Sequence, residues 1–272
     1  MNLNRKRGRK LEAFNAIGFT IFDIPGYFFF TGIGLVVSIS VFIVLLAEKK
    51  YPLQKNMRIL FAVAIFVILC ARIFGCISGI YRDIGMGRNI TWEGIKNTGI
   101  VFYGGLFGLL ISYNVLSKAT KQDAHIMDVL AVCIPLFHSI ARIGCFFGGC
   151  CFGVESNSHI AIDYTTTVFN EAITAYRIPT QLIEATFNFC LFLYLLHLFR
   201  DEDWESKKIL RRYLLLYSIG RFIIEFFRGD LIRGVIFGIS FSQVISVLIW
   251  IYLIATVRRG HETTKMKEEM VL

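Results

Sequence analysis

The sequence predicts an all-α, polytopic membrane protein with seven transmembrane helices. Hydrophobic residues make up 55% of its 272 residues, and the mean hydropathy of +0.60 is high for a soluble domain. Several apolar stretches reach the roughly 18 residues that a membrane-spanning helix needs. Runs such as LIEATFNFCLFLYLL lack the apolar–polar alternation of barrel strands, and an open sheet would leave unpaired backbone groups in lipid.

Seven apolar segments make up the predicted transmembrane domain, which extends over residues 27–257. They cover residues 27–47, 59–79, 99–116, 126–146, 180–199, 212–227 and 239–257. The third and sixth are short, which indicates tilted helices or helix ends that line a polar cavity. Residues 1–26 begin with a basic stretch and continue as LEAFNAIGFTIF, which predicts an interfacial helix lying on the membrane.

The charges of the loops predict the orientation in the membrane. Most loop lysines and arginines lie in residues 48–58, 117–125 and 200–211 and in the tail, residues 258–272. The positive-inside rule places these parts in the cytoplasm. An odd number of spans then puts the N-terminus outside, although residues 1–10 are themselves basic. Either this segment is an exception to the rule, or the number of spans differs by one. The net charge of +9 indicates contact with anionic membrane lipids rather than with nucleic acid, because no soluble domain carries a basic patch.

Charged side chains within the predicted spans are costly and usually functional, and four of them carry our hypothesis. They are Arg72, Arg142, Arg221 and Glu225. Convergence of the three arginines would form a cationic cavity open to the outer leaflet, where phospholipid head groups are the abundant phosphates. Arginine binds phosphate through a planar fork of donors. The alternatives are a structural ion pair between Arg221 and Glu225, four residues apart, and snorkelling of Arg142 to the head groups.

Other polar residues stand at the predicted outer ends of the spans. The motif YGGLFG (residues 103–108) places Tyr103 before a glycine pair, whose alternative role is helix packing through small residues. PTQLIEA begins the fifth span with Gln181 and Glu184, and SFSQVIS begins the seventh with Gln243. Helix N-termini at these positions would favour anionic groups.

These motifs, in this order, resemble the bacterial prolipoprotein diacylglyceryl transferase family. The resemblance rests on YGGLFG, RIGCFFGGCCFG (residues 142–153), PTQL-x-E and LYSIGRFIIEFFRGD followed by SFSQVIS. It covers nearly the whole membrane domain and implies a seven-span enzyme of the bacterial inner membrane. Such an enzyme moves diacylglyceryl from phosphatidylglycerol to the lipobox cysteine of a preprolipoprotein and releases glycerol phosphate. We expect no cofactor.

The resemblance also implies roles for individual residues. Arg142 and Arg221 would bind the lipid phosphate and stabilise the departing charge, and Glu225 would orient Arg221. Tyr103 would assist proton transfer. His138, one turn before Arg142, could take this role instead, and its alternative is a satisfied histidine in the bundle interior. The substrate site would further include Arg72, Gly104, Gly105, Gly153, Gln181, Tyr217, Arg228 and Gln243.

The sequence departs from the family pattern where the acceptor thiol would be activated. The family usually has histidine where Tyr103 stands, and an unperturbed tyrosine is a poor base at neutral pH. In the signature segment, Cys145 and Gly148 replace asparagines and Cys150 replaces a glutamate. The tyrosine expected early in the first span falls near residues 30–31, which are Phe and Thr. The residues that would bind the lipid phosphate thus match the family pattern, whereas those that would activate the acceptor thiol differ from it.

Cys145, Cys150 and Cys151 form a possible thiol site with several interpretations. A disulfide within the group or to Cys76 would be a structural staple on an oxidising face. A thiolate beside Arg142 could instead act as a nucleophile, and packing of small residues is the third alternative. The spacing C-x4-C-C is not a standard zinc spacing, so we expect no metal.

Three rival functions therefore stand beside the diacylglyceryl transferase. The first keeps the phospholipid donor and changes the acceptor, as the rewritten signature segment suggests. The second is a membrane thiol oxidoreductase that uses the three cysteines. The third is a noncatalytic protein that binds or transports phospholipid.

Overall fold

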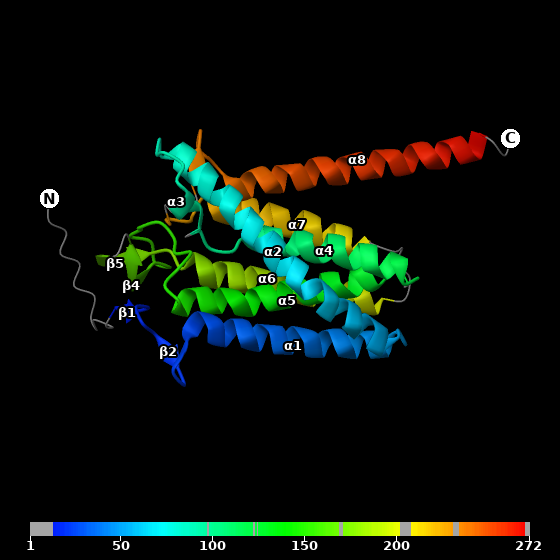
Figure 1. Ribbon diagram of the computed structural model, residues 1–272, viewed down its shortest axis with the longest axis horizontal. Helices are drawn as coiled ribbons and strands as arrows, with labels where there is room; N and C mark the ends of the chain where they lie inside the picture. The colour runs from blue at the N-terminus through cyan, green and yellow to red at the C-terminus, as the bar shows by residue number, and fades with distance from the viewer. Residues whose placement is uncertain are drawn as a thin grey trace.

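A computed structural model describes residues 13–96, 98–121, 123, 125–168, 171–201, 208–230 and 234–269. Within these residues the chain is mostly helical (Figure 1). The helices are α1 (Gly26–Glu48), α2 (Leu53–Gly85), α3 (Trp92–Lys96), α4 (Phe102–Ala119), α5 (Ile126–Phe147), α6 (Thr180–Arg200), α7 (Lys208–Glu225) and α8 (Phe241–Glu269). Each long helix overlaps one of the seven predicted apolar segments, so apolar length located the helices, although α2 and α8 extend beyond their segments.

Four helices in the described part of the chain, α1, α2, α5 and α6, are long and apolar enough to cross a membrane. The apolar part of α8, Phe241–Thr256, is shorter, and α4 and α7 have 18 residues each. The structure therefore supports a polytopic membrane protein, and seven crossings stay a prediction.

Helix α5 is the central element of the bundle. Its most apolar window is 83% buried, whereas that of α2 is only 22% buried. α5 packs against α1, α6 and α7, while α2 packs mainly on α4. Large side chains of α2 such as Phe61 and Ile65 are exposed, as expected for a surface that faces lipid.

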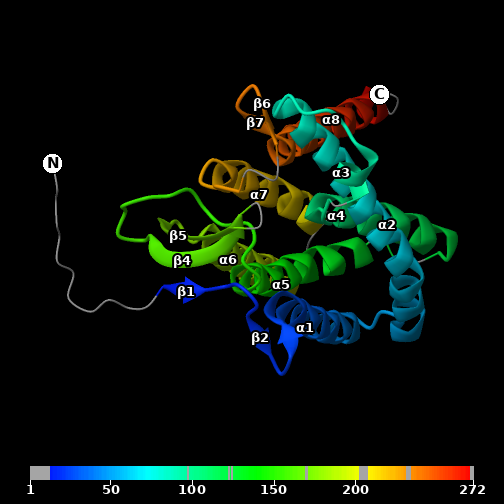
Figure 2. The ribbon, with the colours of Figure 1, turned by 60° about the vertical axis from the view of Figure 1, so that its left-hand side comes forward.

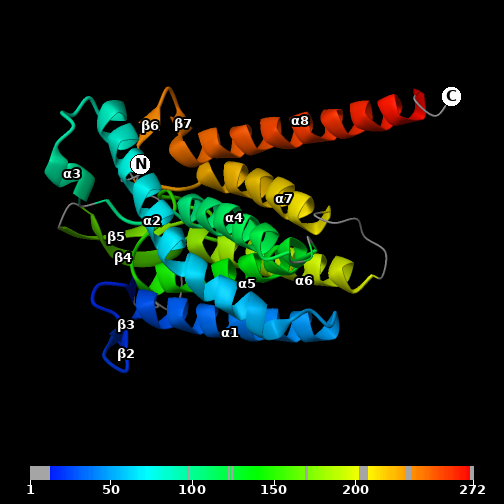
Figure 3. The same ribbon diagram turned by 45° about the vertical axis from the view of Figure 1, so that its right-hand side comes forward.

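The two ends of the bundle differ (Figures 1 and 3). One end, which we call the hairpin end, carries an antiparallel pair, β4 (Ile162–Val168) and β5 (Glu171–Arg177), with Ile162 opposite Arg177. The short pair β6 (Val235–Ile236) and β7 (Ile239–Ser240) lies there too. The turns from α1 to α2 and from α4 to α5 lie at the opposite end, which we call the turn end, and α8 extends beyond the end of α7 in that direction.

The prediction of an interfacial helix in residues 1–26 is wrong for residues 13–25. These residues form β1 (Phe14–Asn15), β2 (Thr20–Ile21) and β3 (Ile24–Pro25), and the rest of the segment lies outside the described residues. β1 runs parallel to β4, with Phe14 opposite Tyr164 (Figure 2), and Ala16 N–H donates to the Thr165 carbonyl at 3.0 Å. Pairing with the open edge of the β4–β5 hairpin satisfies backbone groups, and this outweighs the weak amphipathic pattern. The all-α prediction therefore holds for the bundle but not for its hairpin end.

Candidate functional site

A buried carboxylate joins the two arginines that the sequence singled out. Oε2 of Glu184 in α6 forms an ion pair with Arg142 of α5, 3.1 Å from Nε. The same oxygen accepts a hydrogen bond from Arg221 Nη1 of α7 at 3.0 Å. All three side chains are less than 10% exposed. Three helices thus deliver one carboxylate and two guanidinium groups to a common point near the hairpin end.

The charged network continues along the end of α7. Glu225 Oε2 lies 3.0 Å from Arg221 Nη2 and 3.6 Å from Arg228 Nη1. Arg228 also binds Asp230 through two contacts of 2.9 and 3.2 Å. The expected pairing of Arg221 with Glu225 is therefore present.

We call the six residues Arg142, Glu184, Arg221, Glu225, Arg228 and Asp230 the arginine cluster. Its three positive charges stand against three carboxylates, which is how buried charge is tolerated in a low dielectric.

A backbone pairing brings Arg228 to the arginine cluster. Gly153 forms a bridge with Arg228, and the Val154 N–H donates to the Phe227 carbonyl at 2.9 Å. On its other side the Gly153 N–H donates to the Ile178 carbonyl at 3.1 Å, and a Cβ on Gly153 would collide with that carbonyl, so a glycine fits between the two segments. Gly153 therefore positions Arg228 through the backbone.

His138 adjoins the cluster directly. Its Nε2 accepts from Arg142 Nε at 3.0 Å, and its ring stacks on Phe102 at 3.7 Å with an interplanar angle of 8°. Within the described residues, His138 Nδ1, Glu184 Oε1 and the Tyr217 hydroxyl are buried without a hydrogen-bond partner. Buried polar atoms without partners are uncommon, and three of them around one carboxylate mark a place where a polar ligand can be received.

Tyr103 contacts helix α8 and Tyr217. Its hydroxyl is bonded to Ser246 Oγ of α8 at 2.8 Å, and its ring meets Tyr217 edge-on at 5.6 Å. Between the two residues considered for proton transfer, the structure therefore places His138 against Arg142 and Tyr103 against α8.

Arg72 does not join the other two arginines, contrary to our expectation. Its guanidinium donates to the carbonyls of Thr98 and Lys96 and ties the segment before α4 to α2. The third guanidinium of the cluster belongs to Arg228. The sequence could not distinguish these roles, because the fold of the segment between α3 and α4 decides which carbonyl groups Arg72 meets.

The two glutamines predicted to bind substrate stabilise local structure. Gln181 Nε2 donates to the Cys150 carbonyl at 2.9 Å. Gln243 forms a reciprocal cap with Ser240 at the start of α8: the Ser240 N–H donates to Gln243 Oε1, and the Gln243 N–H donates to Ser240 Oγ. Such a capping box satisfies two backbone donors that a helix start leaves open.

The glycine pair Gly104–Gly105 lies against α2, as the packing alternative predicted. A Cβ at Gly104 would lie 2.5 Å from the Cys70 carbonyl oxygen and 2.9 Å from Ala71 Cα, whereas one at Gly105 would find its nearest neighbours at 3.7 Å.

We expect Gly104→Ala to destabilise the protein by about 1–3 kcal/mol through overpacking. Gly105→Ala should leave stability unchanged or raise it slightly, because alanine is the better helix former. Thermal unfolding of both variants in detergent tests this, and equal midpoints would contradict it.

The three cysteines of the signature segment lie together beside the arginine cluster. The sulfur atoms of Cys145, Cys150 and Cys151 all lie within 4.8 Å of one another, and no described cysteine is in a disulfide. Arg142 Nη1 donates to Cys145 Sγ at 3.9 Å. Hydrogen bonds from the other two thiols, together with the charges of Arg228 and Arg142, hold the pKa of Cys151 well below its usual value. The segment is therefore a compact group of thiols next to positive charge.

Two residues near the site were given no specific role from the sequence. Glu184 was noted only as a hint, although it is the centre of the cluster. Tyr27, near the start of α1, packs against the signature segment: a Cβ added at Gly148 would lie 3.0 Å from Tyr27 Cβ. Phe30, one of the two positions where a tyrosine was expected, stacks on Phe147 instead. Tyr27 stands in the first turn of α1, and this position in the sequence could have identified it.

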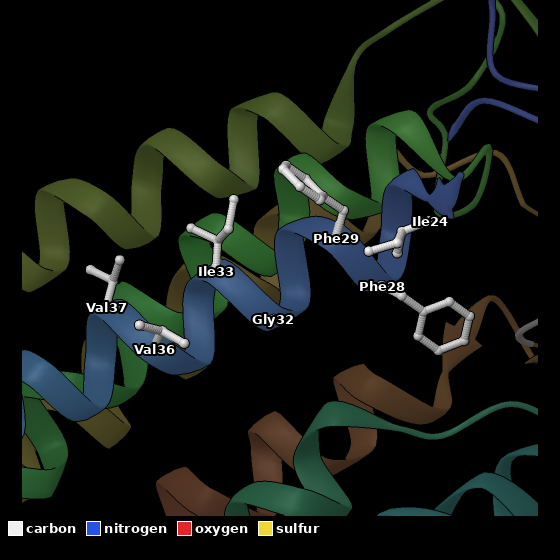
Figure 4. Close-up of a pocket in the computed structure, with 7 residues that line it drawn as sticks. All are labelled: Ile24, Phe28, Phe29, Gly32, Ile33, Val36 and Val37. Atoms are coloured by element: carbon white, nitrogen blue, oxygen red, sulfur yellow. The ribbon is translucent and has the colours of Figure 1, made fainter. Parts of the chain in front are cut away.

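An open apolar groove of about 370 Å³ lies on the outer face of α1. Residues of α1 between Phe28 and Val37 line it together with Ile24, and Phe28 and Phe29 point to different sides of the helix (Figure 4). The arginine cluster does not contribute to its lining. The groove therefore belongs to the lipid-facing surface and is separate from the polar site.

Comparisons with known proteins found one family that matches most of the chain. The model of the family described as prolipoprotein diacylglyceryl transferase matches residues 15–258. Phosphatidylglycerol–prolipoprotein diacylglyceryl transferase 2 of Clostridium perfringens is 30% identical over 230 residues, covering 84% of this chain and 88% of that protein. The similarly named protein of Clostridium tetani is 30% identical over 84% of this chain and 91% of its own length. That of Campylobacter curvus is 27% identical over 87% and 90%.

The matched region contains every helix that contributes to the arginine cluster, and the match covers far more than half of the chain. The chain therefore belongs to the prolipoprotein diacylglyceryl transferase family.

Proposed function

We propose that this protein transfers the diacylglyceryl group of phosphatidylglycerol to the lipobox cysteine thiol of a preprolipoprotein. Relatives about 30% identical over most of the chain carry that activity in their names. The observation that carries the proposal for this chain is the buried meeting of Arg142 and Arg221 on Glu184. It supplies a prearranged pair of guanidinium groups at a depth where the phosphate of a membrane lipid would lie.

The same proposal places the protein in the bacterial inner membrane with seven crossings. The turn end carries Lys49, Lys50, Lys118, Lys121 and Arg200, and the positive-inside rule assigns it to the cytoplasm. The hairpin end and the arginine cluster then face the outside, where a translocated acceptor peptide arrives. β1 lies at the hairpin end, which supports an outer N-terminus, and the C-terminus is cytoplasmic.

The reaction forms one carbon–sulfur bond and breaks one carbon–oxygen bond. The acceptor sulfur attacks the carbon of the diacylglyceryl unit that carries the phosphate. Glycerol phosphate leaves with the electrons of the broken carbon–oxygen bond. Arg142 and Arg221 stabilise the negative charge that develops on the leaving phosphate. Because Glu184 and Glu225 already orient both guanidinium groups, little reorganisation is needed in the transition state.

The thiol proton has to be accepted before or during the attack, because the thiolate is the reactive form. His138 is the better placed acceptor, since its Nε2 lone pair now faces Arg142 Nε. When Arg142 turns toward a phosphate, that lone pair becomes free. The Tyr103 hydroxyl is bonded to Ser246 of α8 instead.

Purified protein in liposomes that contain labelled phosphatidylglycerol tests the function when a lipobox peptide is added. We expect the peptide to gain one diacylglyceryl group for each glycerol phosphate released. A peptide with serine in place of the lipobox cysteine is the control. Glycerol phosphate release without peptide lipidation would instead support a different acceptor, and bound lipid without release would support a noncatalytic protein.

The same assay tests the assignment of the proton acceptor. We expect His138→Gln to lower the transfer rate by about 100- to 10,000-fold, the usual range for loss of a general base, and Tyr103→Phe to lower it less. Thermal midpoints of both variants separate this effect from misfolding. The reverse order of losses, with both variants folded, would return the role to Tyr103.

A further inference from the structure

We propose that Cys145, Cys150 and Cys151 form a binding site for one thiophilic metal ion, with Zn²⁺ as the expected occupant. The spacing of these cysteines led us to expect no metal, but the tertiary arrangement argues otherwise. Their three sulfur atoms lie within 4.8 Å of one another. They form the one cluster of three or more potential ligand side chains found in the described residues.

The turn after α5 creates this proximity. Gly149 and Cys151 have positive φ angles of 71° and 61°, which fold residues 150–151 back onto the last turn of α5. The Cys150 N–H donates to the Cys145 carbonyl at 3.2 Å. A spacing rule built on regular hairpins cannot foresee a turn with two left-handed residues.

Neighbouring residues hold the turn in place without using the sulfur atoms. The carbonyls of Cys150 and Cys151 accept from Gln181 and Thr180 at 2.9 and 3.0 Å. Both donors belong to the first turn of α6. The ligand backbone is therefore anchored to the same helix that carries Glu184, which lowers the conformational cost of binding an ion.

The distances suit a thiolate-bound ion. Zinc–sulfur bonds of about 2.3 Å in tetrahedral geometry place sulfur atoms about 3.8 Å apart. The observed separations, none above 4.8 Å, would have to close by about 1 Å at most. Cys145 is buried, whereas Cys150 and Cys151 are partly exposed, so an ion can reach the group from the hairpin end. Three protein ligands would leave a fourth position for water or another thiol.

Charge balance also favours such a site here. Each thiol that binds Zn²⁺ releases its proton to solvent, so a Zn²⁺ ion with three thiolates carries one net negative charge. Arg142 lies against Cys145, with Nη1 3.9 Å from the sulfur atom. This guanidinium stabilises the anionic complex, whereas it would repel a cation bound by neutral groups. The site therefore favours soft metals that bind thiolate.

The first test uses the full-length protein purified in detergent with reducing agent and Zn²⁺, followed by removal of excess metal. Elemental analysis should find about one zinc ion per chain. A strong chelator should release it and raise the number of alkylatable thiols by the three of the cluster. Protein without bound zinc, with thiols whose reactivity is unchanged by chelator, would overturn the proposal. A disulfide among the three cysteines that persists under reducing conditions would overturn it as well.

Variants locate the ion without relying on enzyme activity. Cys150→Ser should weaken zinc binding at least about tenfold, a lower bound taken from the loss of supporting residues around metal sites. Cys190→Ser, on the exposed side of α6, is the matched control and should keep its zinc. Co²⁺ in place of Zn²⁺ should give thiolate-to-cobalt charge-transfer absorption in the wild type and in the control. If Cys150→Ser fails to fold, the chelator experiment on the wild type decides whether the three thiols bind zinc. Equal zinc contents in the two folded variants would contradict the assignment, whether or not the protein transfers diacylglyceryl.

Discussion

Replacing Arg142 or Arg221 with glutamine lowers the rate of diacylglyceryl transfer by about 100- to 1,000-fold, the loss expected when one preorganised donor to a developing anion is removed. Both guanidinium groups lie on the same carboxylate oxygen, at 3.1 and 3.0 Å, so neither can replace the other without moving. Glutamine keeps much of the side-chain length but lacks the positive charge and the fork of donors. The rate of glycerol phosphate release from phosphatidylglycerol liposomes measures the effect.

Arg200→Gln is the matched control for these variants. Arg200 also pairs with a glutamate, Glu48, at 3.5 Å, but both side chains are more than one third exposed. It stands at the other end of α6, about 24 Å along the helix from Glu184 by helical rise. We expect its activity to equal that of the wild type. Wild-type activity in folded Arg142→Gln and Arg221→Gln proteins would remove the basis of the proposed mechanism.

Glu184→Gln destabilises the folded protein by about 3–5 kcal/mol, the cost of removing one partner from a buried ion pair. The side chain is 2% exposed and contacts two arginines. Arg221 keeps Glu225 as a partner, so the substitution leaves the Arg142 guanidinium in a low dielectric without its carboxylate. Glutamine can still accept a hydrogen bond but cannot balance charge. Thermal and denaturant unfolding in a fixed detergent, followed by the loss of helical signal, measure the change.

Two comparisons isolate charge as the cause of the Glu184→Gln loss. Glu48→Gln removes the same type of partner from an exposed pair and should change stability by no more than about 1 kcal/mol. The double variant Glu184→Gln with Arg142→Gln removes the excess positive charge, because Arg221 and Arg228 keep Glu225 and Asp230 as partners, and it should recover part of the lost stability. A Glu184→Gln protein as stable as Glu48→Gln would show that the buried charges are not what holds α5, α6 and α7 together at this point.

The sequence was informative wherever a local pattern had a single physical meaning. Apolar length located α1, α2 and α4–α8 because a lipid-facing helix needs an uninterrupted run of apolar side chains. The cost of charge inside these runs drew attention to Arg142, Arg221 and Glu225, which the structure joins in one buried network. The four-residue spacing allowed the ion pair of Arg221 with Glu225. The expected convergence of Arg72 with these arginines is not seen, because its guanidinium donates to backbone carbonyls of a segment about 25 residues away in the chain.

What the sequence by itself determined is therefore the helical bundle, its polar residues and its family resemblance, since hydrophobic periodicity and motif order are properties of neighbouring residues. Only the tertiary structure decided that Glu184 is the shared partner of two arginines, that Arg228 rather than Arg72 is the third guanidinium, and that three cysteines gather at one point. These outcomes depend on how α5, α6 and α7 pack and on a turn with left-handed residues. Contacts between distant segments are set by that packing, which no local pattern encodes.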